Sequence, residues 1–374
     1  MSMEHDNILE AQANFTINIL NQIFTSSDGV AFSPYSLTLA LAMCYIGTCG
    51  NTEIEFKNLL SPFIEKVEYC KMLKNSIGNV YNDSDGVSNI YIANRLFIQN
   101  DYVVKEKFKN DIENYLSATF ENVNFSDPVV SAETINNFIS NATHQKIKDL
   151  IKSNSISMDT KAIITNALYF KSQWKKKFNE FLTIDDEFYI TNNEKKIVKM
   201  MSKATSLLYG GNKNFHIVKI PYTHSGSEFI LILPKERNKL HSLLKKMDGK
   251  SLLKLIESTY YYKDVILTMP KFKVESSYSM KKVLTKMGLV TPFNENANFT
   301  GMTSTDKIKI DDVIHKVFVD VNEEGTEAAA ATAIFMVGYS APVSKNDEII
   351  VKADHPFLYI ILDNEKILFS GVYQ

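Results

Sequence analysis

The side chains that most often perform chemistry are few in this chain and poorly spaced for catalysis. The three cysteines, Cys44, Cys49 and Cys70, form neither a CxxC pair nor a Cys/His cluster, and an odd count predicts free thiols rather than a metal site. The run His224-Ser225-Gly226-Ser227 predicts a turn between two strands. The sequence has neither a glycine-rich phosphate loop nor a nucleophile elbow. We therefore expect that the protein is not an enzyme and uses no metal or other cofactor.

One segment, residues 323–346, does not fit a regular element. Its first part favours a helix by composition, because alanine is the best helix former. Loops longer than about 12–15 residues are uncommon in a compact domain and are usually functional. The sequence of this first part is Glu323-Glu324-Gly325-Thr326-Glu327-Ala328-Ala329-Ala330-Ala331-Thr332.

Considered as a strand, the same segment has one face that carries no charge. Successive side chains of a strand point to opposite faces, so every second residue shares a face. Gly325 adds backbone freedom at the start, and no proline interrupts residues 325–341. Such a face could enter the interior of a sheet without burying an ion. Its residues are Thr326, Ala328, Ala330, Thr332, Ile334 and Met336.

The composition is that of an ordinary globular protein. The chain has 374 residues, of which 45% are hydrophobic and 22% charged, and a formal net charge of -2. This near-neutral balance disfavours nucleic acid or an anionic membrane as a partner. No apolar run reaches the roughly 18 residues of a membrane span.

The pattern along the chain predicts a single α+β domain over residues 1–374. Helices dominate the first 150 residues and strands the rest, and neither a repeat nor a linker divides the chain. Expected helices cover 7–24, 34–48, a segment from 51, about 103–116, 131–143, 145–152, 239–257 and 280–287. Expected strands cover 30–32, 89–99, 161–170, 186–191, 195–201, 205–222 with a turn at Gly210-Gly211, 228–233, 265–273, 314–321, 355–363 and 366–373.

Several motifs in order along the chain resemble the serpin family of protease inhibitors. Residues 323–332 resemble the hinge of its inhibitory members, and the resemblance extends over nearly the whole chain. The other matching segments are Phe32-Ser33-Pro34-Tyr35-Ser36, Asn166-Ala167-Leu168-Tyr169-Phe170-Lys171-Ser172-Gln173-Trp174, Ile314-His315-Lys316, Asp354-His355-Pro356-Phe357 and Ile367-Leu368-Phe369-Ser370-Gly371.

The resemblance implies a fold and a mechanism. The fold would contain three β-sheets, eight or nine helices and an exposed reactive-centre loop over about 323–346. A target protease would cleave this loop and be held as a covalent acyl-enzyme, while the freed loop enters the main sheet as a new strand. The expected partner is that protease, and the inhibitor itself is expected to be a monomer.

The resemblance also implies roles for individual residues. The hinge is Glu323, Glu324, Gly325, Thr326, Glu327, Ala328, Ala329, Ala330, Ala331 and Thr332. Ser33, Ser36 and Asn166 are expected in the shutter, a polar cluster behind the central strands. Trp174, His315 and Lys271 are expected at the breach, where insertion begins, with Lys271 paired to Glu323.

The family pattern places the cleaved bond 14 residues after the hinge glycine, between Tyr339 and Ser340. A tyrosine before the cut suits the deep apolar pocket of chymotrypsin-like or cathepsin G-like proteases. A cut between Gly338 and Tyr339 would put Val337 second from the bond, which suits papain-like cysteine cathepsins. A third alternative is a non-inhibitory serpin that acts as a carrier or chaperone, although such members usually break the hinge pattern.

The start of the chain, Met1-Ser2-Met3-Glu4-His5-Asp6, is polar and has no apolar signal-peptide core. Together with the unpaired cysteines, it leads us to expect a cytoplasmic protein. Release from the cell without a signal peptide is the alternative.

Overall fold

We analysed a computed structural model that describes residues 3–24, 29–77, 88–259, 261–304, 307–326 and 348–374. The described part contains nine α-helices and confirms the α+β class. None of its helices is long and apolar enough to cross a membrane. The helices are α1 (Met3–Ile23), α2 (Pro34–Ile46), α3 (Gly50–Leu60), α4 (Lys66–Ile77), α5 (Glu106–Leu116), α6 (Pro128–Ala142), α7 (Leu240–Leu244), α8 (Gly249–Glu257) and α9 (Lys281–Lys286).

Several helices begin at a capping residue that the sequence makes recognisable. The Ser33 side chain accepts a hydrogen bond from Ser36 N, and Pro34 occupies the first turn of α2. The Asp127 and Asp248 side chains cap α6 and α8 in the same way. Because α2 is apolar nearly all round, it is buried from Pro34 to Tyr45 and forms the centre of the molecule.

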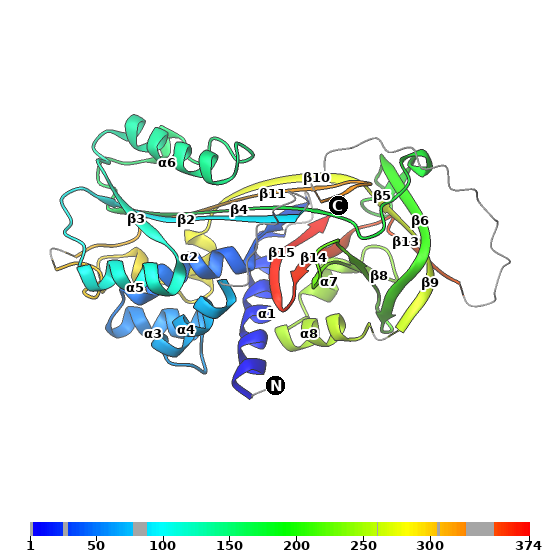
Figure 1. The fold of residues 1–374 in the computed structure, drawn as a ribbon, viewed down its shortest axis with the longest axis horizontal. Coiled ribbons are helices and arrows are strands. Elements are labelled where there is room, and N and C mark those ends of the chain that lie inside the picture. Colours follow the sequence, from blue (N-terminus) through cyan, green and yellow to red (C-terminus); the bar gives the residue numbers. More distant parts are fainter. Residues whose placement is uncertain (1–2, 25–28, 78–87, 260, 305–306, 327–347) are drawn as a thin grey trace.

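A six-stranded sheet runs through the length of the molecule in the order β10-β11-β12-β4-β2-β3. In Figure 1, α6 lies on one side of this sheet and α2 to α5 lie on the other. Both faces of β4 are therefore covered, and nine consecutive residues of it are buried. The strands are β2 (Ser88–Gln99), β3 (Thr119–Val123), β4 (Ala162–Gln173), β10 (Phe272–Ser279), β11 (Asp312–Val321) and β12 (Gly325–Thr326).

The other nine strands form one hydrogen-bonded sheet in two parts that share β6. The end of β6, Leu208–Gly211, pairs with β7, and its body pairs with β5 and β9. The resemblance implies three sheets, and here two of them are continuous through β6. These strands are β1 (Val30–Phe32), β5 (Ile184–Tyr189), β6 (Lys195–Gly211), β7 (Phe215–Pro221), β8 (Ser227–Pro234), β9 (Tyr261–Pro270), β13 (Ile349–Lys352), β14 (Phe357–Asp363) and β15 (Lys366–Tyr373).

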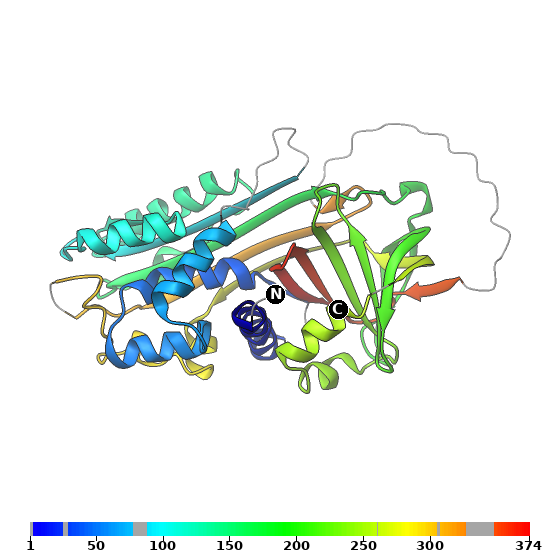
Figure 2. The ribbon, with the colours of Figure 1, turned by 60° about the horizontal axis from the view of Figure 1, so that its bottom comes forward.

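The core divides at the six-stranded sheet. The main core lies between α2, the inner face of this sheet and the buried strands β8, β14 and β15. A smaller core lies between α6 and the outer face, where Ile135 and Ile139 pack with Ile163, Ile314 and Phe318. In Figure 2, α1 is seen nearly along its axis and lies beside α8.

Three expected elements were wrong in detail. The expected helix at 145–152 is a set of turns, because its apolar residues Ile147, Leu150 and Ile151 pack down onto the smaller core without helical hydrogen bonds. The expected turn at Gly210-Gly211 is the end of β6, since both glycines pair with β7. The expected helix 239–257 divides into α7 and α8, because Asp248 caps a new helix. The sequence analysis also missed α4, β3, β10 and β13.

Candidate functional site

The central feature of the site is the seam between β4 and β11. Along its lower part these strands pair directly and in parallel, from Asp312 opposite Ile163 to Phe318 opposite Tyr169. At the upper end, β12 lies between them and is antiparallel to both. Thr326 stands opposite Ser172 of β4 and opposite Val321 of β11. As far as Thr326, β12 therefore runs between β4 and β11 in the direction of the seam.

A tight turn at residues 322–325 brings β12 into this position. The Asn322 side chain accepts hydrogen bonds from Glu324 N and Gly325 N, at 3.0 and 3.2 Å. A Cβ atom on Gly325 would lie 2.1 Å from Ser172 O, so no larger residue fits without moving the backbone. This close approach gives a physical reason for a glycine at the hinge.

The breach is an aromatic stack against the first residues of the hinge. Trp174 is buried and lies flat on Tyr222, with ring centroids 4.5 Å apart. Its indole nitrogen donates to Asn322 O at 2.8 Å, and its backbone nitrogen donates to Glu324 O at 2.9 Å. The Tyr222 hydroxyl lies 2.6 Å from Thr326 Oγ1. The stack therefore holds both sides of the turn that starts β12.

Glu323 anchors the same turn through its carboxylate. Its side chain is buried, and the expected pair with Lys271 is present, with Nζ 3.0 Å from Oε2. Thr183 Oγ1 donates to Oε1 at 2.7 Å. Burial raises the pKa of this carboxyl, but the hydrogen bonds from Thr183 and Lys271 outweigh it, and the pKa lies below its usual value. Glu324 forms a second ion pair, with Lys177.

Lys203 is a breach residue that the sequence analysis missed. It is buried, and its Nζ lies 4.1 Å from the ring centroid of Phe178 and 2.6 Å from Lys176 O. Burial, followed by the charge of Lys176, lowers the pKa of Lys203 to about 7. The pattern around Lys203 resembles that of an ordinary strand, so only the fold reveals its place under the aromatic stack.

The shutter is a buried polar cluster in the middle of the seam. Asn166 donates to Ser36 Oγ at 2.5 Å and also to Asn94 Oδ1. The Ser33 hydroxyl caps α2 nearby by accepting from Ser36 N at 3.1 Å. The expected shutter residues Ser33, Ser36 and Asn166 are therefore brought together. Asn94 of β2 completes the cluster. The sequence analysis missed it because it lies within the expected strand 89–99 and belongs to none of the motifs.

His315 belongs to this cluster and not to the breach, where we expected it. β11 runs parallel to β4 in a register that sets His315 opposite Asn166, in the middle of β4, whereas Trp174 lies just beyond its end. Ser33 N donates to His315 Nε2 at 2.9 Å, so Nδ1 carries the proton and donates to Asn166 Oδ1. Complete burial lowers the pKa of His315 to about 3, and the ring is neutral.

The remaining site residues lie outside the described part of the chain. These are the hinge residues Glu327, Ala328, Ala329, Ala330, Ala331 and Thr332, and the expected reactive bonds at Gly338, Tyr339 and Ser340. The expected turn at 224–227 is confirmed, because it joins β7 to β8. Among the described residues, no three His, Cys, Asp or Glu side chains lie close enough together to hold a metal ion.

Comparison with known proteins assigns the family. The model of the family "Serpin (serine protease inhibitor)" matches residues 10–374. Human Serpin B3 is 32% identical over 99% of both chains, and Antichymotrypsin-2 of Bombyx mori is 29% identical over 96% of both. The crystal structure of Serpin48 from Tenebrio molitor covers 100% of this chain and 99% of its own, with a TM-score of 0.88 and 27% identity. The chain belongs to the serpin family, whose members inhibit serine proteases in general.

Proposed function

We propose that this serpin inhibits chymotrypsin-like serine proteases as a suicide substrate, by inserting its cleaved loop between β4 and β11. The observation that carries the proposal is the position of β12. Gly325 and Thr326 already form a two-residue strand in the seam, with partners on both sides. This strand can lengthen if β4 and β11 also separate where they now pair directly, from Phe318–Tyr169 to Asp312–Ile163.

The register of β12 defines what an inserted strand would meet. Continued from Thr326, it would place residue 332 opposite both Asn166 and His315, and residue 336 opposite Ala162 at the far end of β4. Parallel pairs between β4 and β11 would be replaced by antiparallel pairs on both sides, which are slightly more stable per residue. The thirteen residues from Thr326 to Gly338, at roughly 3.3 Å each, would span about 40 Å.

The proposed chemistry begins as ordinary proteolysis. The protease serine attacks the Tyr339 carbonyl carbon, an ester forms, and the Tyr339–Ser340 bond breaks with a proton passing to the leaving amine of Ser340. Because Tyr339 follows residue 336 closely, insertion would carry the esterified protease past the far end of β4. This movement would separate the protease from the new chain end at Ser340 and distort the active site of the protease. The distorted active site could then not hydrolyse the ester.

The choice of target rests on Tyr339, a side chain that fits a deep apolar pocket. The name of the Bombyx mori relative, Antichymotrypsin-2, points the same way. A cut between Gly338 and Tyr339 by a papain-like cysteine protease is the second candidate. The cytoplasmic location expected from the sequence stays a prediction.

Incubation with chymotrypsin, followed by a denaturing gel, tests the proposal. We expect a complex that survives boiling, together with a released peptide that begins at Ser340. The matched change Tyr339→Arg should move inhibition from chymotrypsin to trypsin while the same complex forms. Complete cleavage at Tyr339 without a complex would contradict inhibition, and a complex only with a papain-like protease would contradict the target class.

A further inference from the structure

Three apolar side chains are exposed beside the first residues of the hinge. They belong to Phe181 and Leu182, in the short 3₁₀ helix Glu180–Leu182, and to Ile184 at the start of β5. Phe181 is 92% exposed. Single exposed apolar residues are common on protein surfaces, but a group of them marks a surface that contacts a partner. We call Phe181, Leu182 and Ile184 the apolar ridge.

The backbone around the apolar ridge is held in place by hydrogen bonds and packing. The Asn179 side chain accepts a hydrogen bond from Phe181 N at 3.0 Å, and Leu182 N donates to Asn179 O at 2.9 Å. Phe178 is buried against Trp174, with ring centroids 6.1 Å apart. Phe181 is therefore presented to the solvent on an ordered backbone, and a partner that covers it loses little affinity to the ordering of this segment.

The apolar ridge lies between the two chain segments that border the expected reactive-centre loop. On one side, Thr183 Oγ1 donates a hydrogen bond to the Glu323 carboxylate at 2.7 Å, three residues before Thr326. On the other side, Asp186 of β5 pairs with Lys352 of β13 at 2.7 Å. In Figure 1, β5 and β13 lie at the same end of the molecule. Both segments that lead into the loop therefore contact the strand that begins at the apolar ridge.

The length of the chain limits how far a protease bound at Tyr339 can lie from this end of the molecule. Tyr339 is thirteen residues from Thr326 and nine from Glu348 in the sequence, so it can lie at most about 47 Å from Thr326 and about 32 Å from Glu348. A domain of about 250 residues has a diameter of about 45 Å. A bound protease is therefore about as wide as this distance, and its surface meets the surface around Thr326 and β13.

We propose that the apolar ridge is a docking surface for the target protease, which contacts it through an apolar surface next to the active-site cleft of the protease. Phe181 is the anchor of this contact, because buried aromatic side chains dominate the binding energy of interfaces. The inference rests on the proposed function, since the partner is the protease that cleaves the loop. The apolar ridge adds to the selectivity that Tyr339 gives, and a protease without an apolar surface at this place binds more weakly.

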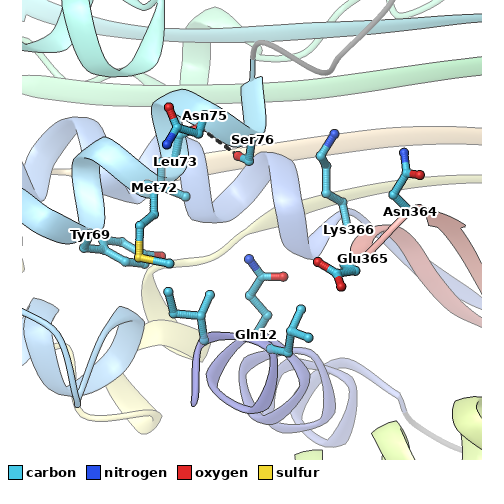
Figure 3. A pocket seen from close by; sticks show the side chains of 11 residues that line it. Gln12, Tyr69, Met72, Leu73, Asn75, Ser76, Asn364, Glu365 and Lys366 are labelled. Atoms are coloured by element: carbon cyan, nitrogen blue, oxygen red, sulfur yellow. Dashed lines mark hydrogen bonds between the residues drawn. The ribbon is translucent and has the colours of Figure 1, made fainter. Parts of the chain in front are cut away.

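Titration calorimetry of the full chain with chymotrypsin whose catalytic serine is replaced by alanine tests docking without the chemistry of inhibition. Phe181→Ala should weaken binding about tenfold and leave the melting temperature unchanged, because the side chain is exposed. Phe63→Ala is the matched control and should leave the affinity unchanged. Phe63 is 65% exposed and precedes α4, which lies away from β5 (Figure 1) and supplies Tyr69 and Met72 to a separate cavity (Figure 3).

Active chymotrypsin separates a failure of docking from a failure of inhibition. With the active protease, Phe181→Ala should form the complex that survives boiling about tenfold more slowly, with the same number of inhibitor molecules consumed per protease. If the wild type forms this complex but Phe181→Ala and Phe63→Ala bind the inactive protease equally well, the docking surface is overturned and inhibition stands. If Phe181→Ala alone loses affinity while the wild type is cleaved without a complex, docking stands and inhibition is rejected. Absence of wild-type binding to the inactive protease would also overturn the docking surface.

Discussion

His315 and Asn166 face each other across the seam, and the hydrogen bond between His315 Nδ1 and Asn166 Oδ1 joins β11 to β4. Any strand that enters this seam has to break the bond. Continued from Thr326, the register of β12 brings Thr332 to this level, and alternation turns its side chain toward the same face as the two residues. The Thr332 hydroxyl could then accept or donate in place of the lost contact. The shutter thus joins β4 to β11 in this structure, and under the proposed mechanism it would also offer polar partners to the inserted strand.

The neutral state of His315 makes stability depend on pH. Its pKa is about 3 in the folded chain and about 6.5 when unfolded, so between these values the unfolded chain binds more protons. Stability is therefore complete above about pH 6.5 and falls as the pH falls toward 3. At pH 5 the loss is about 2 kcal/mol. Urea unfolding gives the free energy of unfolding of the wild type and of His315→Gln. The difference between the two proteins should narrow by this amount from pH 7 to pH 5, and a difference that does not change with pH would contradict the assignment.

Charge on the inserting face should block inhibition. In Thr326→Arg, the guanidinium would point at Tyr222 in the buried breach, where the carboxylates of Glu323 and Glu324 are already paired with Lys271 and Lys177, and burying this unpaired charge costs several kcal/mol. The variant should become a substrate, cleaved by chymotrypsin without forming a stable complex. Glu327→Arg carries the same side chain on the opposite face of the strand and should remain an inhibitor. Equal inhibition by both variants would contradict insertion in this register.

The Glu323–Lys271 pair should contribute measurably to stability. In Lys271→Met, the Glu323 carboxylate, which is 5% exposed, keeps its hydrogen bond from Thr183 but loses the ammonium group. Because Lys271 itself is 45% exposed, we expect the free energy of unfolding to fall by about 1–2 kcal/mol. Lys199→Met, which breaks a pair exposed by 59% and 58%, is the matched control and should change stability by less than about 0.5 kcal/mol. Similar losses in the two variants would show that burial of Glu323 is unimportant.

The hydroxyl of Tyr222 should hold the start of β12 in place. Tyr222→Phe keeps the ring on Trp174 but leaves the buried Thr326 hydroxyl without this partner, at a cost of about 1–3 kcal/mol. The chain has a single tryptophan, so Trp174 fluorescence reports unfolding at this site. In a protein that already carries Thr326→Val, the further change Tyr222→Phe should leave the free energy of unfolding nearly unchanged. Additive losses in the double variant would mean that the two hydroxyls do not interact.

The sequence predicts those parts of the fold whose pattern is local. The apolar run of α2 with its Ser33-Pro34 start and the largely apolar run of β4 were both recognisable, since burial on all sides leaves few polar positions. β10 escaped prediction because its apolar–polar alternation is short, covering Phe272 to Glu275, and the rest of the strand contains three serines. Its strand conformation depends on pairing with β11, which no local pattern contains.

The site was predictable in its members but not in their arrangement. The motifs identified Ser33, Asn166, Trp174 and His315, but a motif does not contain the register between β11 and β4. That register moves His315 from the breach to the shutter. Asn94, Tyr222 and Lys203 were missed for the same reason, because each acquires its role only when a strand distant in sequence is placed beside it.

The crystal structure of the protein after chymotrypsin has cut its loop tests the central claim most directly. The account predicts a new strand between β4 and β11 that is antiparallel to both, with Thr332 opposite Asn166 and His315 and the His315–Asn166 hydrogen bond broken. A cleaved protein in which β4 and β11 remain paired from Asp312–Ile163 to Phe318–Tyr169 would contradict it.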